Sequence, residues 1–152
     1  MRQAEELRYA ILALQREGNR SLANALKPLG VTPAQAEVLR VLDERAPLTL
    51  AGLGDLLICE SGTGPSRLVD RLVGQGLVSR EVGAADRRAV TLTLTDAGRA
   101  TSANVAQIEQ AMYQSIDEAV GGESVDALLR VARTMLAGSS AGAALARRAE
   151  RL

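Results

Sequence analysis

The spacing of apolar residues changes from a helical period to a period of two in one part of the chain, and this change constrains the fold most. In segments 77–82 and 89–95, apolar side chains alternate with polar ones, which is typical of paired strands with one buried face. The six residues between them are polar and basic and predict a hairpin loop. Two short helical patterns, 50–58 and 61–75, precede this hairpin. We therefore expect a mostly helical (α+β) chain with one small antiparallel sheet.

Longer helical patterns lie on both sides of this central segment. An apolar stripe runs from Leu7 to about Lys27, and further stripes cover 96–120 and 125–136. Thr32, Thr49 and Thr95 each stand where a side-chain oxygen can cap the first turn of a helix. Glycines and serines at 138–142 predict a hinge before a last turn or two at 143–152.

Composition excludes most catalytic chemistry. The chain of 152 residues has no histidine and a single cysteine, Cys59, so the Ser-His-Asp and Cys-His arrangements and nearly all zinc sites are excluded. We expect no catalytic residue, no metal and no cofactor. Without Phe or Trp the chain also lacks the aromatic platform on which single-stranded nucleic acids stack. We interpret Cys59 as a small buried hydrophobe, the alternative being a redox switch.

Charge leaves room only for a local anion site. Eighteen acidic residues balance eighteen basic ones, so the net charge is zero. Seventeen of the basic residues are arginine, whose guanidinium can form two parallel hydrogen bonds to a phosphate or to the edge of a guanine. Segment 61–75 suits such a site, because Leu68 and Leu72 would face inward and its first turn is small and polar. The candidate contacts there are Ser61, Thr63, Gly64, Ser66, Arg67 and Arg71. The alternative is an ordinary solvated helix face.

Three motifs carry a resemblance to a known family. They are SRLVDRL at 66–72, GLVSR at 76–80 and DRRAVTLTLTDAG at 86–98. With the surrounding residues, 29–99, they resemble the MarR family of bacterial winged helix-turn-helix regulators. This resemblance implies a DNA-binding homodimer with a helical dimerisation domain from 1–30 and 97–152 and a winged helix-turn-helix domain at 31–96. It also implies that 61–75 is the recognition helix, which enters the major groove.

The resemblance further assigns the hairpin tip, or wing. It implies that Arg88 enters the minor groove beside Arg87, while Asp86 holds the wing arginines. A narrow minor groove concentrates negative potential, which a guanidinium on a hairpin tip can reach. The alternative is a surface ion pair of little consequence. The sequence departs from the family at Gly62, Gly64 and Pro65, so we expect a recognition helix capped at Ser61 that begins late, is distorted, or is ordered mainly on DNA.

Together these features predict a dimeric, sequence-specific regulator of transcription that binds a pseudo-palindromic double-stranded operator. We expect a ligand-responsive repressor without enzyme activity, in the cytoplasm and not in a membrane. The alternative is a winged-helix protein-interaction module that does not bind DNA, favoured by the small local charge and by the glycines and proline at the start of the recognition helix. The family implies a small-molecule effector in a cleft between the two parts. The candidate polar residues of that cleft are Tyr9, Arg16, Arg40 and Tyr113.

Overall fold

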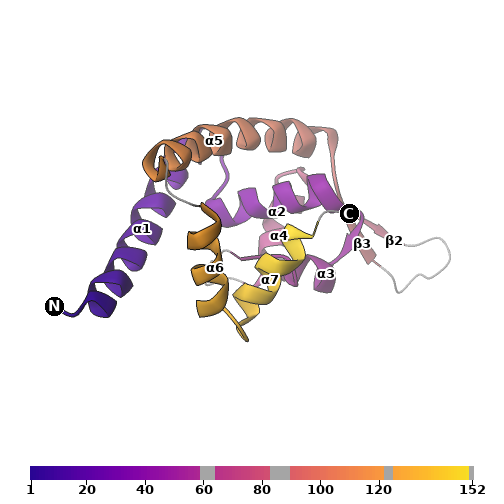
Figure 1. The fold of residues 1–152 in the computed structure, drawn as a ribbon. Coiled ribbons are helices and arrows are strands. Elements are labelled where there is room, and N and C mark those ends of the chain that lie inside the picture. Colours follow the sequence, from indigo (N-terminus) through magenta and orange to yellow (C-terminus); the bar gives the residue numbers. More distant parts are fainter. Residues whose placement is uncertain (59–63, 83–89, 122–124, 151–152) are drawn as a thin grey trace.

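The computed structural model describes residues 1–58, 64–82, 90–121 and 125–150 (Figure 1). It confirms a mostly helical chain with one three-stranded antiparallel sheet. In chain order the elements are α1 (Gln3–Leu26), a short 3₁₀ helix η1 (Lys27–Leu29), α2 (Pro33–Arg45), β1 (Leu48–Thr49), α3 (Leu50–Gly54), α4 (Pro65–Gly74), β2 (Val78–Val82), β3 (Val90–Leu94), α5 (Asp96–Val120), α6 (Val125–Met135) and α7 (Ser140–Ala149).

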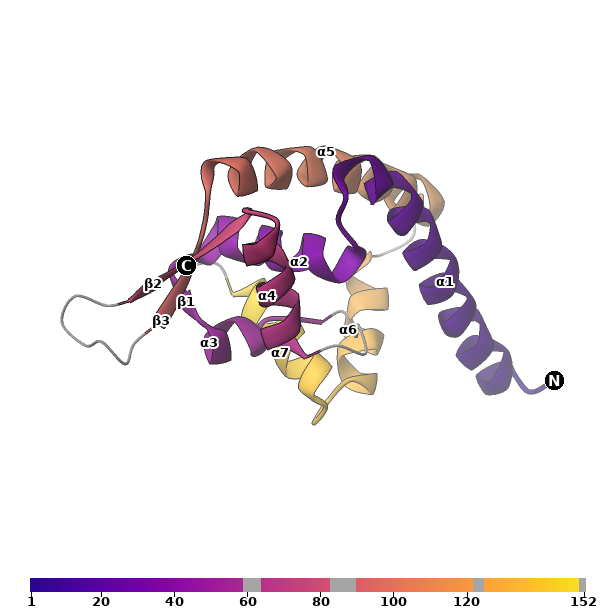
Figure 2. The same cartoon turned by 180° about the vertical axis from the view of Figure 1, so that it is seen from behind.

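Helix α2 lies at the centre of the molecule. Helix α5 runs along one side of α2, and the pair α6 and α7 returns along the other side (Figures 1 and 2). The N-terminal half of α1 projects from the body, whereas β2 and β3 project in the opposite direction. Helices α3 and α4 pack against α2 and complete the helical part of the central domain.

The helix caps predicted at Thr32, Thr49 and Thr95 are confirmed. Thr32 accepts from the backbone N–H of Gln35, and the Gln35 side chain accepts from the backbone N–H of Thr32, which is a complete capping box. Thr49 and Thr95 likewise accept from the third residue of their helices. The left-handed φ of 73° at Gly76 ends α4 as predicted, because glycine adopts this conformation without a Cβ clash.

Three predicted boundaries are wrong. The helix expected over 50–58 ends at Gly54, and the helix expected over 61–75 begins at Pro65 with Gly64 as its N-cap, so Ser61 is not the cap. Proline has no N–H to donate and its φ suits the first helical position, which explains the later start. Near the C-terminus, the last helix begins at Ser140, inside the segment predicted as a hinge, and not at 143. It has 10 residues, and Ser139 is its N-cap.

The apolar core sits between α2 and the elements around it. Leu39 and Leu42 of α2 are almost fully buried, together with Leu72 of α4, Leu92 of β3 and Val105 of α5. Strand β1, which the sequence analysis missed because it has 2 residues, pairs antiparallel with β3 and places Leu48 opposite Leu92. The sheet order is β1-β3-β2.

The start of α5 lies unusually close to the chain that leads into β2. A Cβ built on Gly98 would lie 1.9 Å from the carbonyl oxygen of Leu77, so only glycine fits at this position. The same region is held by Thr95, whose backbone N–H donates to the Leu77 carbonyl at 3.1 Å and whose hydroxyl donates to the Gly76 carbonyl at 2.7 Å. The first turn of α5 is therefore fixed against the end of α4.

Candidate nucleic-acid interface

Helix α4 has one buried face and one polar exposed face. Leu68 and Leu72 are buried, as predicted, and Val69 is buried beside them. Ser66, Arg67 and Arg71 are exposed. The buried leucines fix the rotation of the helix, so the polar side chains are presented to solvent.

The exposed face of α4 is electropositive. Within the described residues, Arg67 and Arg71 form no ion pair, and they lie four positions apart, on the same side of the helix. The one acidic side chain of α4, Asp70, pairs with Arg80 of β2 at 2.5 Å. Its charge is thereby balanced, and the two guanidinium groups remain available to a polyanion.

The first turn of α4 is open to a close approach. Gly64 is exposed, and a Cβ at this position would meet no atom within 4 Å. A helix N-terminus directs backbone N–H groups and the positive end of the helix dipole outward, which favours phosphate. Gly64, Ser66, Arg67 and Arg71 therefore share the exposed side and start of one helix. Ser61 and Thr63 lie outside the described residues.

The hairpin lies beside this helix. Val82, the last residue of β2, pairs with Val90, the first residue of β3, so the hairpin strands remain paired up to the loop. Figure 1 shows both strands extending beyond the helical body. The Asp70–Arg80 ion pair connects α4 directly to β2. The predicted wing residues Asp86, Arg87 and Arg88 lie outside the described residues, and their assignment stays a prediction.

The chain is similar to known proteins in both sequence and fold. Residues 31–98 match the profile described as "Winged helix DNA-binding domain". The reduced form of MarR from E. coli is 30% identical, with a TM-score of 0.67 over 86% of this chain and 96% of MarR. The chain belongs to the MarR family.

Two further proteins of similar sequence extend the comparison. CouR, a transcriptional repressor solved bound to a 23-mer DNA duplex, is 30% identical, with a TM-score of 0.73 over 87% of this chain and 93% of CouR. The organic hydroperoxide resistance transcriptional regulator of Bacillus subtilis (strain 168) is 31% identical over 98 residues. That match spans 64% of this MarR-family chain and 66% of the Bacillus protein.

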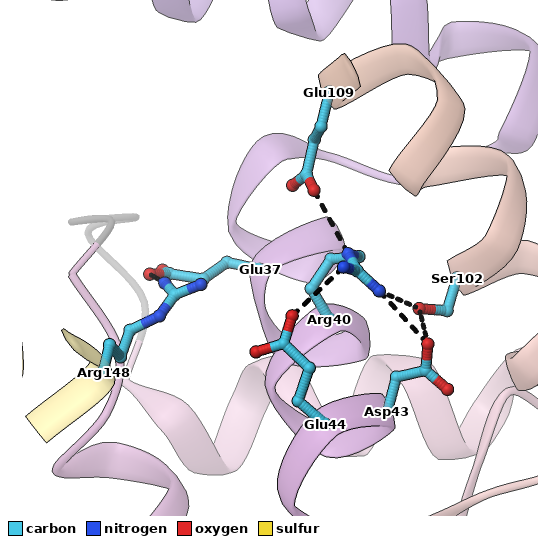
Figure 3. Close-up of polar contacts among 7 residues, drawn as sticks. All are labelled: Glu37, Arg40, Asp43, Glu44, Ser102, Glu109 and Arg148. Atoms are coloured by element: carbon cyan, nitrogen blue, oxygen red, sulfur yellow. Dashed lines mark hydrogen bonds and ion pairs between the residues drawn. The ribbon is translucent and has the colours of Figure 1, made fainter. Parts of the chain in front are cut away.

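Arg40, a predicted effector residue, lies within a network that joins α2 to α5 (Figure 3). Its guanidinium donates to Glu109 of α5 at 3.1 Å and pairs with Asp43 and Glu44 of α2, each also at 3.1 Å. Ser102, which is fully buried, donates to Asp43 at 3.1 Å. In this structure Arg40 therefore connects the winged helix-turn-helix region to the long helix α5.

Tyr113 lies near this network. Partial burial and the carboxylate of Glu109 raise the pKa of the Tyr113 phenol, while Arg148 and Arg40 act in the opposite direction. Tyr9 and Arg16 instead lie exposed on α1, where the Arg8 guanidinium stands 5.1 Å from the Tyr9 ring centre. The structure thus brings two of the four predicted effector residues into one neighbourhood.

Two surface clefts are formed by other residues. One of about 470 Å³ lies between α6 and α7 and includes Leu136, Leu145 and Arg133. A smaller one of about 220 Å³ includes Pro47, Thr93 and Arg99. The effector site assigned to Tyr9, Arg16, Arg40 and Tyr113 therefore stays a prediction.

The described ranges hold no group of His, Cys, Asp and Glu side chains suited to a metal ion. Across those same ranges, no helix is both long enough and apolar enough to span a bilayer. Two polar pairs were not predicted from the sequence, namely Asp70–Arg80 between α4 and β2 and Glu37–Arg148 between α2 and α7. Both join residues that are distant in sequence, so helical or strand periodicity carries no signal for either pair.

Proposed function

We propose that this MarR-family chain is a dimeric transcriptional regulator that binds a pseudo-palindromic double-stranded DNA operator in a sequence-specific manner. The observation that carries the proposal is the exposed face of α4, where Arg67 and Arg71, beside Ser66, form no ion pair with any residue that the structure describes. Arginine and serine at such positions contact phosphates and base edges in the major groove. The similar repressor CouR, solved on a DNA duplex, supports this choice.

The alternative of an interaction module that does not bind DNA now has less support. Part of its support was the presence of glycine and proline at the start of the recognition helix. Gly64 and Pro65 occupy the N-cap and the first helical position, where both residues are well tolerated. They do not break the helix, and the side chains that follow them keep a regular helical arrangement.

Dimerisation is proposed through the helices outside the winged helix-turn-helix region. Large apolar side chains are exposed on α1, the second half of α5 and α6, and a soluble monomer rarely leaves so many unpaired. They include Leu7, Ile11, Leu12 and Leu14 of α1, Ile116 of α5, and Leu128, Leu129, Val131 and Met135 of α6. A two-fold dimer would present two α4 helices to successive major grooves, about 34 Å apart.

The regulator is proposed to act in the cytoplasm, where DNA is accessible to it, as a repressor that a small-molecule effector releases. Membership of a family of transcriptional regulators supports a regulatory role, and no catalytic role is assigned to any residue. The connection between α2 and α5 through Arg40 and Glu109 supports an effector cleft near these helices, because a ligand there would contact both parts of the chain.

DNA binding is tested by electrophoretic mobility shift of the fragment upstream of the protein's own gene, with a scrambled fragment as competitor. We expect specific binding by the parent chain and loss of about tenfold or more in affinity for Arg67→Ala/Arg71→Ala. Arg2→Ala is the matched control, because Arg2 is exposed at the far end of α1. Equal affinity of the double variant and the parent would contradict the assignment of α4.

The dimer is tested independently by light scattering at micromolar concentration. We expect a mass of about 32 kDa, which is twice the 16.0 kDa of one chain. Leu128→Glu should shift the mass toward that of the monomer, because a charge on this apolar face would be desolvated in the dimer. A mass near 16 kDa for the parent would contradict the proposed dimer.

A further inference from the structure

Helix α7 is held against the winged helix-turn-helix region of its own chain at three points. The Arg45 guanidinium of α2 donates to the carbonyls of Arg147, Arg148 and Glu150 at 3.2, 3.3 and 2.8 Å. The Arg147 guanidinium donates to the Asp55 carbonyl, at the end of α3, at 3.2 Å. Arg148 pairs with Glu37 of α2 at 2.8 Å (Figure 3).

Glu37 connects this helix to the helix-turn-helix motif. Its side chain is only 7% exposed, and its Oε1 atom accepts both from Arg148 and from the backbone N–H of Ile58, the latter at 2.9 Å. Ile58 follows α3 and precedes Gly64, the N-cap of α4, by six positions. Through Glu37, α7 is therefore connected to α2, which packs against α4, and to Ile58, which follows α3.

We infer that α7 is a C-terminal strap that positions the recognition helix α4, and that Arg148 is its positioning residue, acting through Glu37 and the Ile58 amide. The inference rests on the proposed function, since its consequence is a change in DNA affinity. It extends that function by assigning a regulatory role to the last helix. A signal that detaches α7 would weaken operator binding without touching the DNA-contacting face.

The charge of the buried Glu37 carboxylate has a desolvation cost. A buried carboxylate is stable when a guanidinium and N–H donors surround it. Without Arg148, the Glu37 carboxylate loses a cationic partner at its Oε1 atom and turns toward water. That movement weakens the hydrogen bond that Ile58 donates to the same atom. The three α7 anchors lie on α2 and α3, which also pack against α4, so the effect is local to the motif.

The first test measures the Ile58 amide directly by hydrogen exchange in the dimeric full-length protein without DNA. We expect Arg148→Gln to raise the exchange rate of this amide by about tenfold, and Arg148→Lys to restore part of the protection because it keeps the charge. Arg130→Gln, an exposed arginine of α6, is the matched control and should leave the rate unchanged. An unchanged Ile58 rate in Arg148→Gln would overturn the inference.

The second test measures affinity for the operator fragment. Arg148→Gln should weaken binding by about tenfold, within the usual range of coupling between two sites. The double variant Glu37→Gln/Arg148→Gln should recover most of that loss, because a neutral amide oxygen can still accept from Ile58 without a buried charge. Recovery is not expected if α7 only contributes general stability. A double variant as weak as Arg148→Gln, or an Arg148→Gln variant as tight as the parent, would overturn the strap.

The two proposals fail in distinguishable ways. If the parent chain binds no DNA fragment, the proposed function fails and the regulatory role of α7 falls with it, whatever the exchange data show. Suppose instead that the parent binds the operator and Arg67→Ala/Arg71→Ala does not. If Arg148→Gln then matches the parent in the Ile58 exchange rate and in operator affinity, only the assignment of α7 as a strap is wrong.

Discussion

Asp70 of α4 and Arg80 of β2 form an ion pair of 2.5 Å that joins the helix proposed to read DNA to the first strand of the hairpin. The two residues are ten positions apart, and both side chains are about half exposed. Because the pair is exposed, it contributes little to stability. Its greater effect is on charge. Asp70 neutralises Arg80, which would otherwise add to the positive charge of Arg67 and Arg71.

Asp70→Asn should therefore tighten DNA binding, because it removes a negative charge from α4 and releases Arg80. We expect the slope of log affinity against log salt to steepen by up to about one unit, and the free energy of unfolding to change by less than about 1 kcal/mol. A salt titration of operator affinity checks the first statement. Asp126→Asn on α6 is the control; weaker binding by Asp70→Asn would show that the pair is needed for geometry.

Arg88→Ala tests the wing, whose tip lies outside the described residues. A minor-groove arginine should contribute about 1–3 kcal/mol to binding and about one unit to the salt slope. A solvated arginine contributes little to folding, so the melting temperature and the dimer mass should match the parent. Operator affinity that is unchanged across the salt titration would show that the wing assignment is wrong.

Gly98→Ala and Gly74→Ala form a matched pair for stability. The methyl group at position 98 would collide with the Leu77 carbonyl oxygen, whereas a methyl group at position 74 meets nothing within 4 Å. We expect Gly98→Ala to lower the free energy of unfolding by about 2 kcal/mol or more. Gly74→Ala should raise it by up to about 1 kcal/mol, because it removes backbone freedom from the unfolded chain. Denaturant unfolding that ranked the two variants in the opposite order would contradict the position of α5.

Tyr113 should ionise above its ordinary value of about 10, because partial burial and Glu109 raise its pKa. A raised pKa in the folded state means that the tyrosine contributes stability below pH of about 10, which is lost as pH rises through the folded pKa. Absorbance titration of the Tyr9→Phe variant isolates Tyr113. Adding Glu109→Gln should lower the Tyr113 pKa, and a rise would contradict the described arrangement.

Cys59→Ser should leave DNA binding and its response to peroxide unchanged. Its neighbours in sequence, Ile58 and Glu60, carry no positive charge that would favour the reactive thiolate. Cys59 lies outside the described residues, so this expectation rests on the sequence. Peroxide-induced release of DNA by the parent, absent in the variant, would show that Cys59 is a redox switch.

Local chemistry allowed much of the fold to be predicted from sequence. The capping box of Thr32 and Gln35, the cap at Thr95 and the glycine stop at Gly76 involve residues only a few positions apart. The boundary at Ser61 was wrong because two signals competed there, a hydroxyl that can cap and a proline that can begin a helix. Proline at the first helical position determined the start.

The site was predictable only in part. The exposed arginines of α4 follow from helical periodicity once the buried leucines are located. The contacts of α7 do not follow from periodicity. Arg45 donates to carbonyl oxygens 102 to 105 positions away in the sequence, and Arg148 pairs with Glu37, which lies 111 positions away. Such pairs depend on how helices return toward each other in space, and alanine-rich sequence at 140–149 gives no signal of where it packs.

The Thr95 hydroxyl serves two helices at once, since it donates to the carbonyl of Gly76 after α4 and accepts from the N–H of Gly98 in α5. Helix α5 has 25 residues and, at about 1.5 Å per residue, is a rod of about 37 Å. A tilt of about 5° at this joint would displace the far end of the rod by about 3 Å. In the proposed dimer, a small rearrangement around the Thr95 hydroxyl would therefore be amplified along α5 into a larger change in the distance between the two α4 helices.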